Sequence, residues 1–506
     1  MIYSIRFIPK LLFFVILLIT QTTFAKNSWF DRPYYLPRNS NSFQYETLDK
    51  KHGLYLSGML SARGDAFMNT QGIIMNLGSN ATPLDKMNNV FRTWIYTASP
   101  TFEAQIDDHI HLYFNPDFGQ QQYRIFDANV DINYFRSLSV ITGLQSSLIS
   151  GFENSSFNYF GFTTTMSPWR EIAINVYGEL GYQEPSAYSS SHTRGLQSWI
   201  LYELAITNGA PDGAFPGVIP FSVNSEANLY QSFSFNTGNK AFEGRVFINP
   251  FIQEENHILQ HLGLGFAGSA MTAVNQIGLP AYLSIGRNVI FQFESLEKYS
   301  IAQGPRSRIH PQMIWTHHQF SIMGDYIIST QHLANGFDTN IEQYPTIQQV
   351  NHARQILLLW NLTGEDFSWS SFYEPHQNFR PFEKQALGAF QLGFRLSSLS
   401  LDPSVFQSSY VNDSGQTQYN YSDPRTSVQQ AQAYGVVLNW LWNKNFRLST
   451  EFSYTRYKGG CSTGALQSPI NPGCLTAPND YIAQPGSQVI DRPAEVVMLQ
   501  QASIVF

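Results

Sequence analysis

A two-residue alternation of apolar and polar side chains recurs along this chain. Residues 434–442 carry bulky apolar side chains at even positions, and residues 446–454 do the same after a short polar connection. Successive side chains of a strand point to opposite faces, so the pattern predicts a β-hairpin with one apolar and one polar face. Trp440 and Trp442, near a strand end, are typical of residues at a membrane interface.

The same alternation appears in residues 126–134 and 390–397. Counting such segments predicts about 16 strands, an even number within the range of bacterial outer-membrane barrels. The last strand, at 495–506, ends the chain on Phe506 and has one polar misfit, Gln500, on its apolar face. Short turns are expected on one rim and long loops on the other. The long Gly-, Pro-, Ser- and Asn-rich stretches lie at 68–88, 183–196, 208–224, 403–428 and 459–491.

The N-terminus has the order of a secretory signal peptide. Arg6 and Lys10 precede an apolar run at 11–19, and small residues follow up to Ala25, so cleavage is expected after Ala25. An uncleaved anchor is the alternative, but the run is short for a spanning helix of about 20 residues. We therefore expect a signal peptide at 1–25, a short periplasmic lead-in at 26–51 and one barrel domain at 52–506.

Composition supports strands that face lipid. Charged residues make up 13% of the chain and aromatic residues 15%, whereas soluble domains carry about 25% charged residues. A charge on the lipid face of a barrel costs about 2–4 kcal/mol at the bilayer midplane. The net charge of −7 gives no indication of nucleic-acid binding, which needs clustered Lys and Arg. The sequence thus predicts an all-β fold, a transmembrane antiparallel β-barrel in the bacterial outer membrane.

Few residues suggest other chemistry. Cys461 and Cys474 lie in one Gly- and Pro-rich segment, and in an exported protein they are expected to form a disulfide. No second Cys or His pair at ligand spacing accompanies them, so we expect no metal and no cofactor. His109, His111 and the His317–His318 pair have no accompanying nucleophile motif, so no catalytic residue is assigned. A siderophore-type receptor would need a plug domain and a 22-stranded barrel, for which the chain is too short.

Seven segments, in order across nearly the whole mature chain, resemble the phosphate- and polyphosphate-selective porins (the O/P-type outer-membrane porins). The LTGE, GAFQLGFR and GVVLNW sequences within them are the most specific. The resemblance implies a 16-stranded homotrimeric barrel with inward-folded loops, in which lumen arginines conduct phosphate-like anions through bidentate contacts. The segments are 53–67, 90–119, 126–157, 242–251, 357–367, 387–402 and 431–457.

The chain departs from the family where the arginines matter. Met59 follows Gly58 where the family has an arginine, and Thr93 follows Arg92 where the family has a pair of arginines. Asp127 and Asp131 are expected to point into the lumen. The candidates for an anion path are Arg63, Arg92, Arg245, Arg395 and Arg447.

Two interpretations of these arginines remain open. They could form a cationic path for anions, or they could be solvated lumen residues paired with neighbours such as Glu243 and Glu451. The expected function is a porin for small ionic solutes, anions such as phosphate above all. The alternative is a general or structural, surface-interacting outer-membrane barrel without phosphate selectivity.

Overall fold

The computed structural model describes most of the barrel wall and parts of its connections. Described are residues 43–47, 52–68, 90–119, 124–135, 137–150, 157, 161–168, 170–182, 198–210, 212, 240–254, 257–276, 279, 281–293, 300–335, 346–367, 372–383, 386–411, 417–419, 421–462 and 488–506. The expected signal peptide at 1–25 lies outside them. Among the described residues, no helix is long and apolar enough to cross a membrane.

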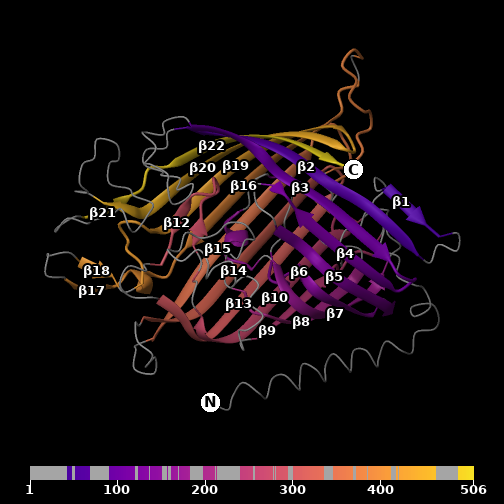
Figure 1. The fold of residues 1–506 in the computed structure, drawn as a ribbon. Helices are drawn as coiled ribbons and strands as arrows, with labels where there is room; N and C mark the ends of the chain where they lie inside the picture. The colour runs from indigo at the N-terminus through magenta and orange to yellow at the C-terminus, as the bar shows by residue number, and fades with distance from the viewer. Residues whose placement is uncertain are drawn as a thin grey trace.

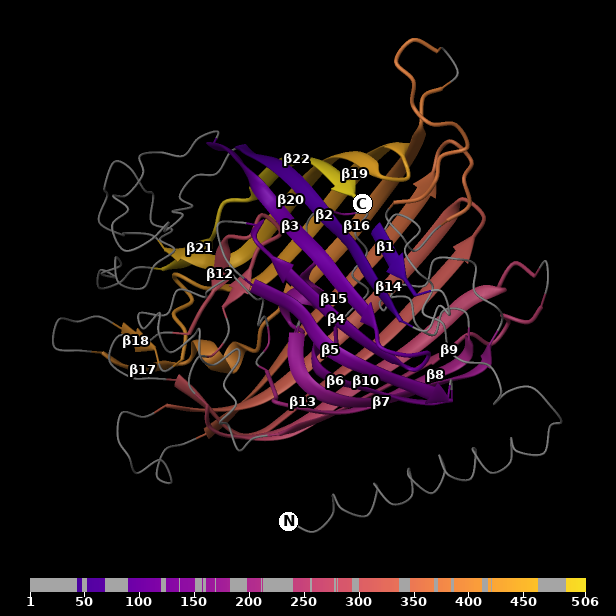
Figure 2. The same ribbon diagram turned by 45° about the vertical axis from the view of Figure 1, so that its right-hand side comes forward.

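Within the described residues, sixteen antiparallel strands pair in chain order and close into a barrel (Figures 1 and 2), as the sequence predicted. The last strand pairs with the first, and this pairing closes the ring. The strands are β2 Gly53–Met68, β3 Val90–Gln105, β4 Ile110–Asp117, β5 Arg124–Phe135, β6 Leu138–Ser146, β7 Arg170–Tyr182, β8 Ser198–Thr207, β9 Ala241–Ile248, β10 His261–Gln276, β13 Ser300–His317, β14 Phe320–Asn335, β15 Thr346–Asn361, β16 Ala389–Ser400, β19 Val428–Asn443, β20 Phe446–Ser462 and β22 Glu495–Val505.

The remaining elements are short. A strand inside the expected lead-in, β1 Phe43–Glu46, pairs with the start of β2, so this segment is not wholly irregular. The others lie in connections between barrel strands: α2 Phe162–Thr165, β11 Tyr282–Leu283, β12 Val289–Phe291, the 3₁₀ helix η4 Pro403–Phe406, β17 Ser408–Val411, β18 Thr417–Tyr419 and β21 Val489–Asp491.

Alternation along the strands places the apolar side chains outside, as expected. On β20, Phe452 and Tyr454 are exposed on the outer face, whereas Glu451 and Ser453 are buried on the inner face. Residues that stand opposite each other in a sheet share a face. Because β16 pairs with β19 and β19 with β20, the apolar side chains of these two strands also lie on the outer face. The predicted misfit Gln500 is exposed on the outer face of β22.

The two rims differ in their connections. The turn rim holds Phe506 and the short connections 106–109, 136–137, 318–319 and 444–445, and it lies on the right in Figure 1. The opposite, loop rim holds long connections such as 147–169, 277–299 and 401–427. The expected division has exceptions, because the connections 183–197, 249–260 and 362–388 join strand ends at the turn rim. Short turns define the periplasmic side of such barrels, so the loop rim is the outer side.

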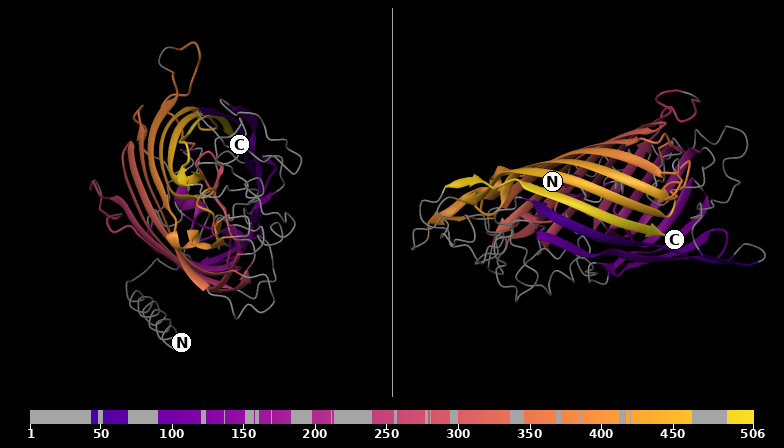
Figure 3. Two further views of the ribbon diagram at one scale, coloured as in Figure 1. Left: turned by 90° about the vertical axis from the view of Figure 1, so that its left-hand side faces the viewer. Right: turned by 90° about the horizontal axis from the view of Figure 1, so that it is seen from above.

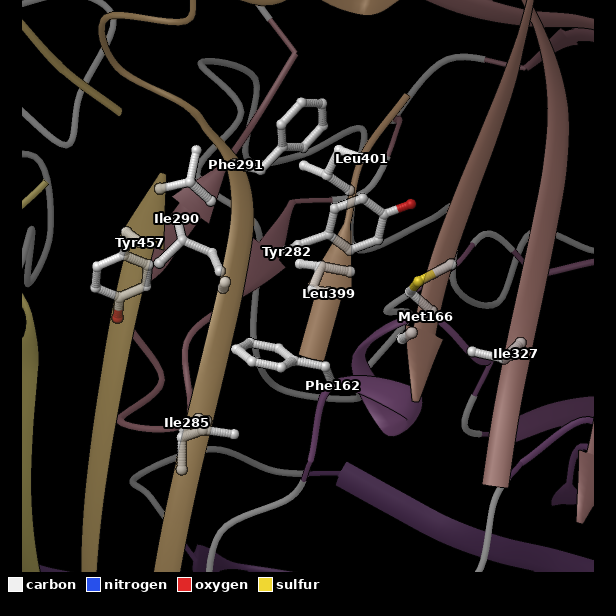
Figure 4. Packing of buried hydrophobic residues seen from close by; sticks show 14 of the residues in the cluster. Phe162, Met166, Tyr282, Ile285, Ile290, Phe291, Ile327, Leu399, Leu401 and Tyr457 are labelled. Carbon is white, nitrogen blue, oxygen red and sulfur yellow. The ribbon is translucent and has the colours of Figure 1, made fainter. Parts of the chain in front are cut away.

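Three connections from the loop rim fold into the barrel, where their apolar side chains form a core (Figures 3 and 4). Phe162 comes from 147–169, Phe291 from 277–299 and Phe406 from 401–427. They pack with inward-facing wall residues such as Leu399 and Leu499. The bore is therefore apolar in part of its length, whereas alternation alone predicts a polar interior throughout.

Candidate channel lining

Three of the candidate arginines lie on the inner wall on β16, β20 and β2, each of which is separated from the next by one strand. Arg395 on β16 donates from Nη2 to Glu451 Oε1 on β20 at 2.8 Å. Arg63 on β2 donates from Nε to Asp65 Oδ1 at 2.9 Å. Arg447 on β20 lies with its guanidinium carbon 4.9 Å from the ring centre of Phe372. All three arginines are buried, so carboxylates and an aromatic ring, rather than bulk water, surround their charge.

Arg245 on β9 differs from these arginines in its access to solvent. Its guanidinium forms an ion pair with Glu203, which lies directly opposite on β8. The side chain of Arg245 is 22% exposed, compared with 1% for Arg395. A partly exposed guanidinium can exchange its hydrogen bonds with a passing solute, whereas a fully buried one cannot do so without local rearrangement.

Two sequence predictions fall wholly or partly outside the described residues. Arg92 stands opposite Asp65 in the register of β3 and β2, but its side chain lies outside what the structure describes. Cys461 at the end of β20 is disulfide-bonded. Its expected partner, Cys474, lies outside the described residues.

Arg306 and Arg308 on β13 are buried inner-wall arginines that the sequence analysis did not select. Arg308 donates from Nε to Asp212 Oδ1 at 2.6 Å and from Nη2 to the Ala210 carbonyl at 2.8 Å. Arg306 donates from Nη2 to the same carbonyl at 3.0 Å. These contacts fix the segment after β8 against the wall, so the two arginines anchor a loop.

A buried hydroxyl joins this anchor to a second inserted segment. Tyr282 on β11 donates from its hydroxyl to Asp212 Oδ2 at 3.2 Å, and Asn351 Nδ2 donates to Tyr282 at 3.0 Å. Burial, and then the negative charge of Asp212, raise the pKa of Tyr282 well above its usual value. The hydroxyl therefore stays protonated and keeps its role as a donor.

The segment after β6 is held by backbone and side-chain hydrogen bonds to the wall. Glu243 on β9 accepts from the Leu148 N–H at 2.9 Å and from Ser147 Oγ at 3.0 Å. Ser397 Oγ on β16 accepts from the Phe162 N–H at 2.9 Å. One of the two interpretations paired the inner arginines with Glu243. In the structure the Glu243 carboxylate binds this inserted segment, and Arg245 pairs with Glu203.

Carboxylates dominate the inner wall on one side of the barrel. Asp127 and Asp131 on β5 face inward, as expected. Arg170 forms an ion pair with Asp127 at 3.2 Å, and the Tyr177 hydroxyl donates to Asp131 at 2.9 Å. The inward-facing carboxylates of β3 to β9 include Glu103, Asp127, Asp131, Glu171, Glu179, Glu203 and Glu243.

A closed ring of strands with an apolar outside and charged groups on its inner wall is the architecture of bacterial outer-membrane barrels, and barrels of this strand number include the porins. The chain is therefore a multi-pass β-barrel of the bacterial outer membrane with a porin-like fold.

No protein-family model matches the chain, and no curated protein matches its sequence significantly. Solved outer-membrane channels are similar in fold. DcaP of Acinetobacter baumannii has a TM-score of 0.47 at 9% identity, over 91% of this chain and 99% of that one. The anion-selective porin from Comamonas acidovorans has a TM-score of 0.43 at 8% identity, over 90% of this chain and 100% of that one. OprB of Pseudomonas putida has a TM-score of 0.43 at 10% identity, over 91% of this chain and 95% of that one.

Proposed function

We propose that this barrel is a porin through which small polar and ionic solutes diffuse across the outer membrane, and that anions such as phosphate pass along its inner arginines. The observation that carries the proposal is Arg245, an inward-facing guanidinium that is partly exposed. A guanidinium offers a fork of N–H donors that matches phosphate oxygens. The resemblance to phosphate-selective porins supports the same solute class.

The pairing of the inner arginines limits the expected selectivity. Arg63 and Arg395 each have a carboxylate within 3 Å, and Arg245 is paired with Glu203, so each pair contributes little net charge to the field in the bore. Charged rings select ions through their net field. We therefore propose a weak anion preference.

A porin without anion selectivity is the second candidate. It is favoured by the carboxylates of β3 to β9, among them Glu103, whose side chain is 25% exposed. Carboxylates attract cations and would offset the field of Arg245. The same barrel would then conduct small solutes of either charge.

Reversal potentials in planar bilayers under a salt gradient distinguish a weakly anion-selective porin from one without anion selectivity. We expect the unaltered protein to favour anions weakly and Arg245→Ala to reduce that preference, because the variant removes a positive charge and leaves Glu203. Lys444→Ala, in a turn at the periplasmic rim, is the matched control and is expected to leave the potential unchanged. Cation selectivity in the unaltered protein would contradict anion transport, and the absence of single-channel steps would contradict a porin altogether.

We infer that the protein is not an enzyme, because its histidines accompany no nucleophile motif. A lipid-hydrolysis assay on the purified barrel is expected to show no turnover. Turnover that disappears on substitution of one serine and one histidine would contradict this inference.

We also propose a homotrimer whose subunits meet at β22, β2 and β3. The outer face there includes small residues such as Ala62 and Ala98, and Gln500 is exposed on it. A polar side chain on a lipid face lacks partners in hydrocarbon. Contact between subunits would give Gln500 partners, and the small residues would permit close approach.

A further inference from the structure

Positive charge is concentrated at one place on the outer face of the barrel. Among the described residues of the barrel strands, exposed outward-facing side chains with a formal charge are confined to Arg354 on β15 and to Arg456 and Lys458 on β20. None of the three has a carboxylate within ion-pair distance in the described part of the chain. The sixteen barrel strands thus carry exposed positive charge here and, in their described residues, no exposed outward-facing carboxylate. The nearby exposed carboxylate of Asp491, on the short strand β21, accepts a hydrogen bond from the Gly459 N–H at 2.8 Å.

Register places these cations in two adjacent rows across neighbouring strands. Arg354 pairs with Ser398, Ser398 with Gln432, and Gln432 with Arg456. In the next row toward the loop rim, Lys458 pairs with Gln430. Neighbouring strands lie about 4.8 Å apart, so the two arginines stand about 14 Å apart with small polar side chains between them. We call these side chains, together with Tyr326 and His352, the outer basic row.

The outer basic row lies at the level of the membrane interface. Tyr326 is opposite Arg354 in the register, and Tyr434 and Tyr454 are exposed one row nearer the bilayer centre. Tyrosines at this position mark the interface between hydrocarbon and head groups. Arg456 is ten residues beyond Phe446 along β20, about 33 Å of strand. At a tilt of about 40° this spans the roughly 25 Å apolar band, which places the row at the outer leaflet.

The guanidinium groups are oriented by neighbours but keep free donors. Arg354 donates from Nε to Ser398 Oγ at 2.9 Å, and Arg456 donates from Nε to Gln432 Oε1 at 2.9 Å. The Nη groups of Arg354 have no partner among the described residues. Free guanidinium donors beside hydroxyl and amide groups are suited to phosphate oxygens.

We propose that the outer basic row binds the phosphate groups of a phosphorylated glycolipid in the outer leaflet. A second copy of this chain fits less well, because the described residues of its sixteen barrel strands offer no exposed outward-facing carboxylate to pair with the row. A basic cluster at the interface attracts anionic head groups by about 1 kcal/mol per Lys or Arg. The binding adds a lipid contact to the barrel and does not depend on what the bore conducts.

The test measures binding of two lipids by native mass spectrometry of the purified barrel, namely bis-phosphorylated lipid A and the same lipid after phosphatase treatment. The double variant Arg354→Gln/Arg456→Gln removes two charges and keeps polar side chains. We expect it to bind the phosphorylated lipid about thirtyfold more weakly. The unaltered barrel should bind the dephosphorylated lipid as weakly as the variant binds the phosphorylated one.

The matched control is Arg380→Gln/Lys444→Gln, which removes two positive charges at the periplasmic rim and should bind the phosphorylated lipid as the unaltered barrel does. Heat-modifiable mobility in gel electrophoresis verifies that each variant is folded. Equal binding of the phosphorylated lipid by the Arg354/Arg456 variant and the unaltered barrel would overturn the proposal. So would a change of oligomeric state in that variant, which would assign the row to contacts between copies.

Discussion

At the scale of single residues, the inner wall combines charge with near-complete burial. Arg395 and Glu451 are both buried, with 1% and 0% of their side chains exposed. Removing one member of a buried pair leaves the other charge without compensation, whereas removing both removes the desolvation cost together with the attraction. The pair therefore sets the position of these side chains more than it adds to stability.

Removing one partner of the Arg395–Glu451 pair is expected to cost more stability than removing both. Arg395→Met is expected to lower the free energy of unfolding by about 3–5 kcal/mol, because it removes the cation that forms an ion pair with the buried Glu451 carboxylate. The double variant Arg395→Met/Glu451→Met is expected to lie closer to the unaltered protein. Urea unfolding in lipid vesicles, followed by tryptophan fluorescence, measures both. Equal loss in the single and double variants would contradict the prediction.

The inner arginines also show where residue-level sequence reasoning stopped. Alternation correctly placed Arg395 and Arg447 on the inner face, because side-chain direction in a strand follows from the period alone. One of the two interpretations named Glu451 as a partner of these arginines, but alternation did not assign it to Arg395, because the two residues are 56 positions apart in sequence. Nor did it distinguish Arg245, which is partly exposed, from Arg308, which anchors a loop.

At the scale of elements, the inserted segments are the feature that determines the bore. Their core contains Phe162 and Phe291, each with 0% of its surface exposed. The contact between Phe162 N–H and Ser397 spans 235 residues, and no local pattern encodes such a contact. One signal was present in the sequence. In residues 356–360, both faces of β15 are apolar, and a strand with two apolar faces is covered on both.

The core of the inserted segments predicts a change in conductance. Phe162→Ala and Phe291→Ala each remove a buried ring at a cost of about 3–5 kcal/mol. This loss of stability affects the packing of the inserted segments rather than the hydrogen-bonded wall. We therefore expect the barrel to stay intact and its single-channel conductance to rise. Phe394→Ala, on the outer face and 45% exposed, is the control and should conduct as the unaltered protein does. Unchanged conductance in both core variants would show that these segments do not narrow the path.

At the scale of the whole molecule, the sequence predicted the architecture because one repeated rule specifies it. An apolar outer face, repeated strand after strand up to the terminal Phe506, requires a ring, since an open edge has no partners in lipid. Closure is specific in detail. Gly58 and Phe506 exchange backbone hydrogen bonds of 2.9 and 3.1 Å, and a Cβ on Gly58 would lie 2.8 Å from the Phe506 ring. The long connections at the periplasmic rim were not predicted, because composition marks a loop but not its side of the membrane.

The closure region is also where subunits are proposed to meet, and a steric test follows. Ala62→Phe places a large ring at a small outward-facing position of β2, so we expect a monomer instead of a trimer, because close approach of a second subunit is blocked. Ala270→Phe makes the same change at an exposed outward position of β10, where lipid accommodates a ring, and should leave the trimer intact. Sedimentation in density-matched detergent gives the mass of each. A trimer that persists in Ala62→Phe would place the subunit contact elsewhere on the barrel, and Gln500 would then face lipid in the assembly.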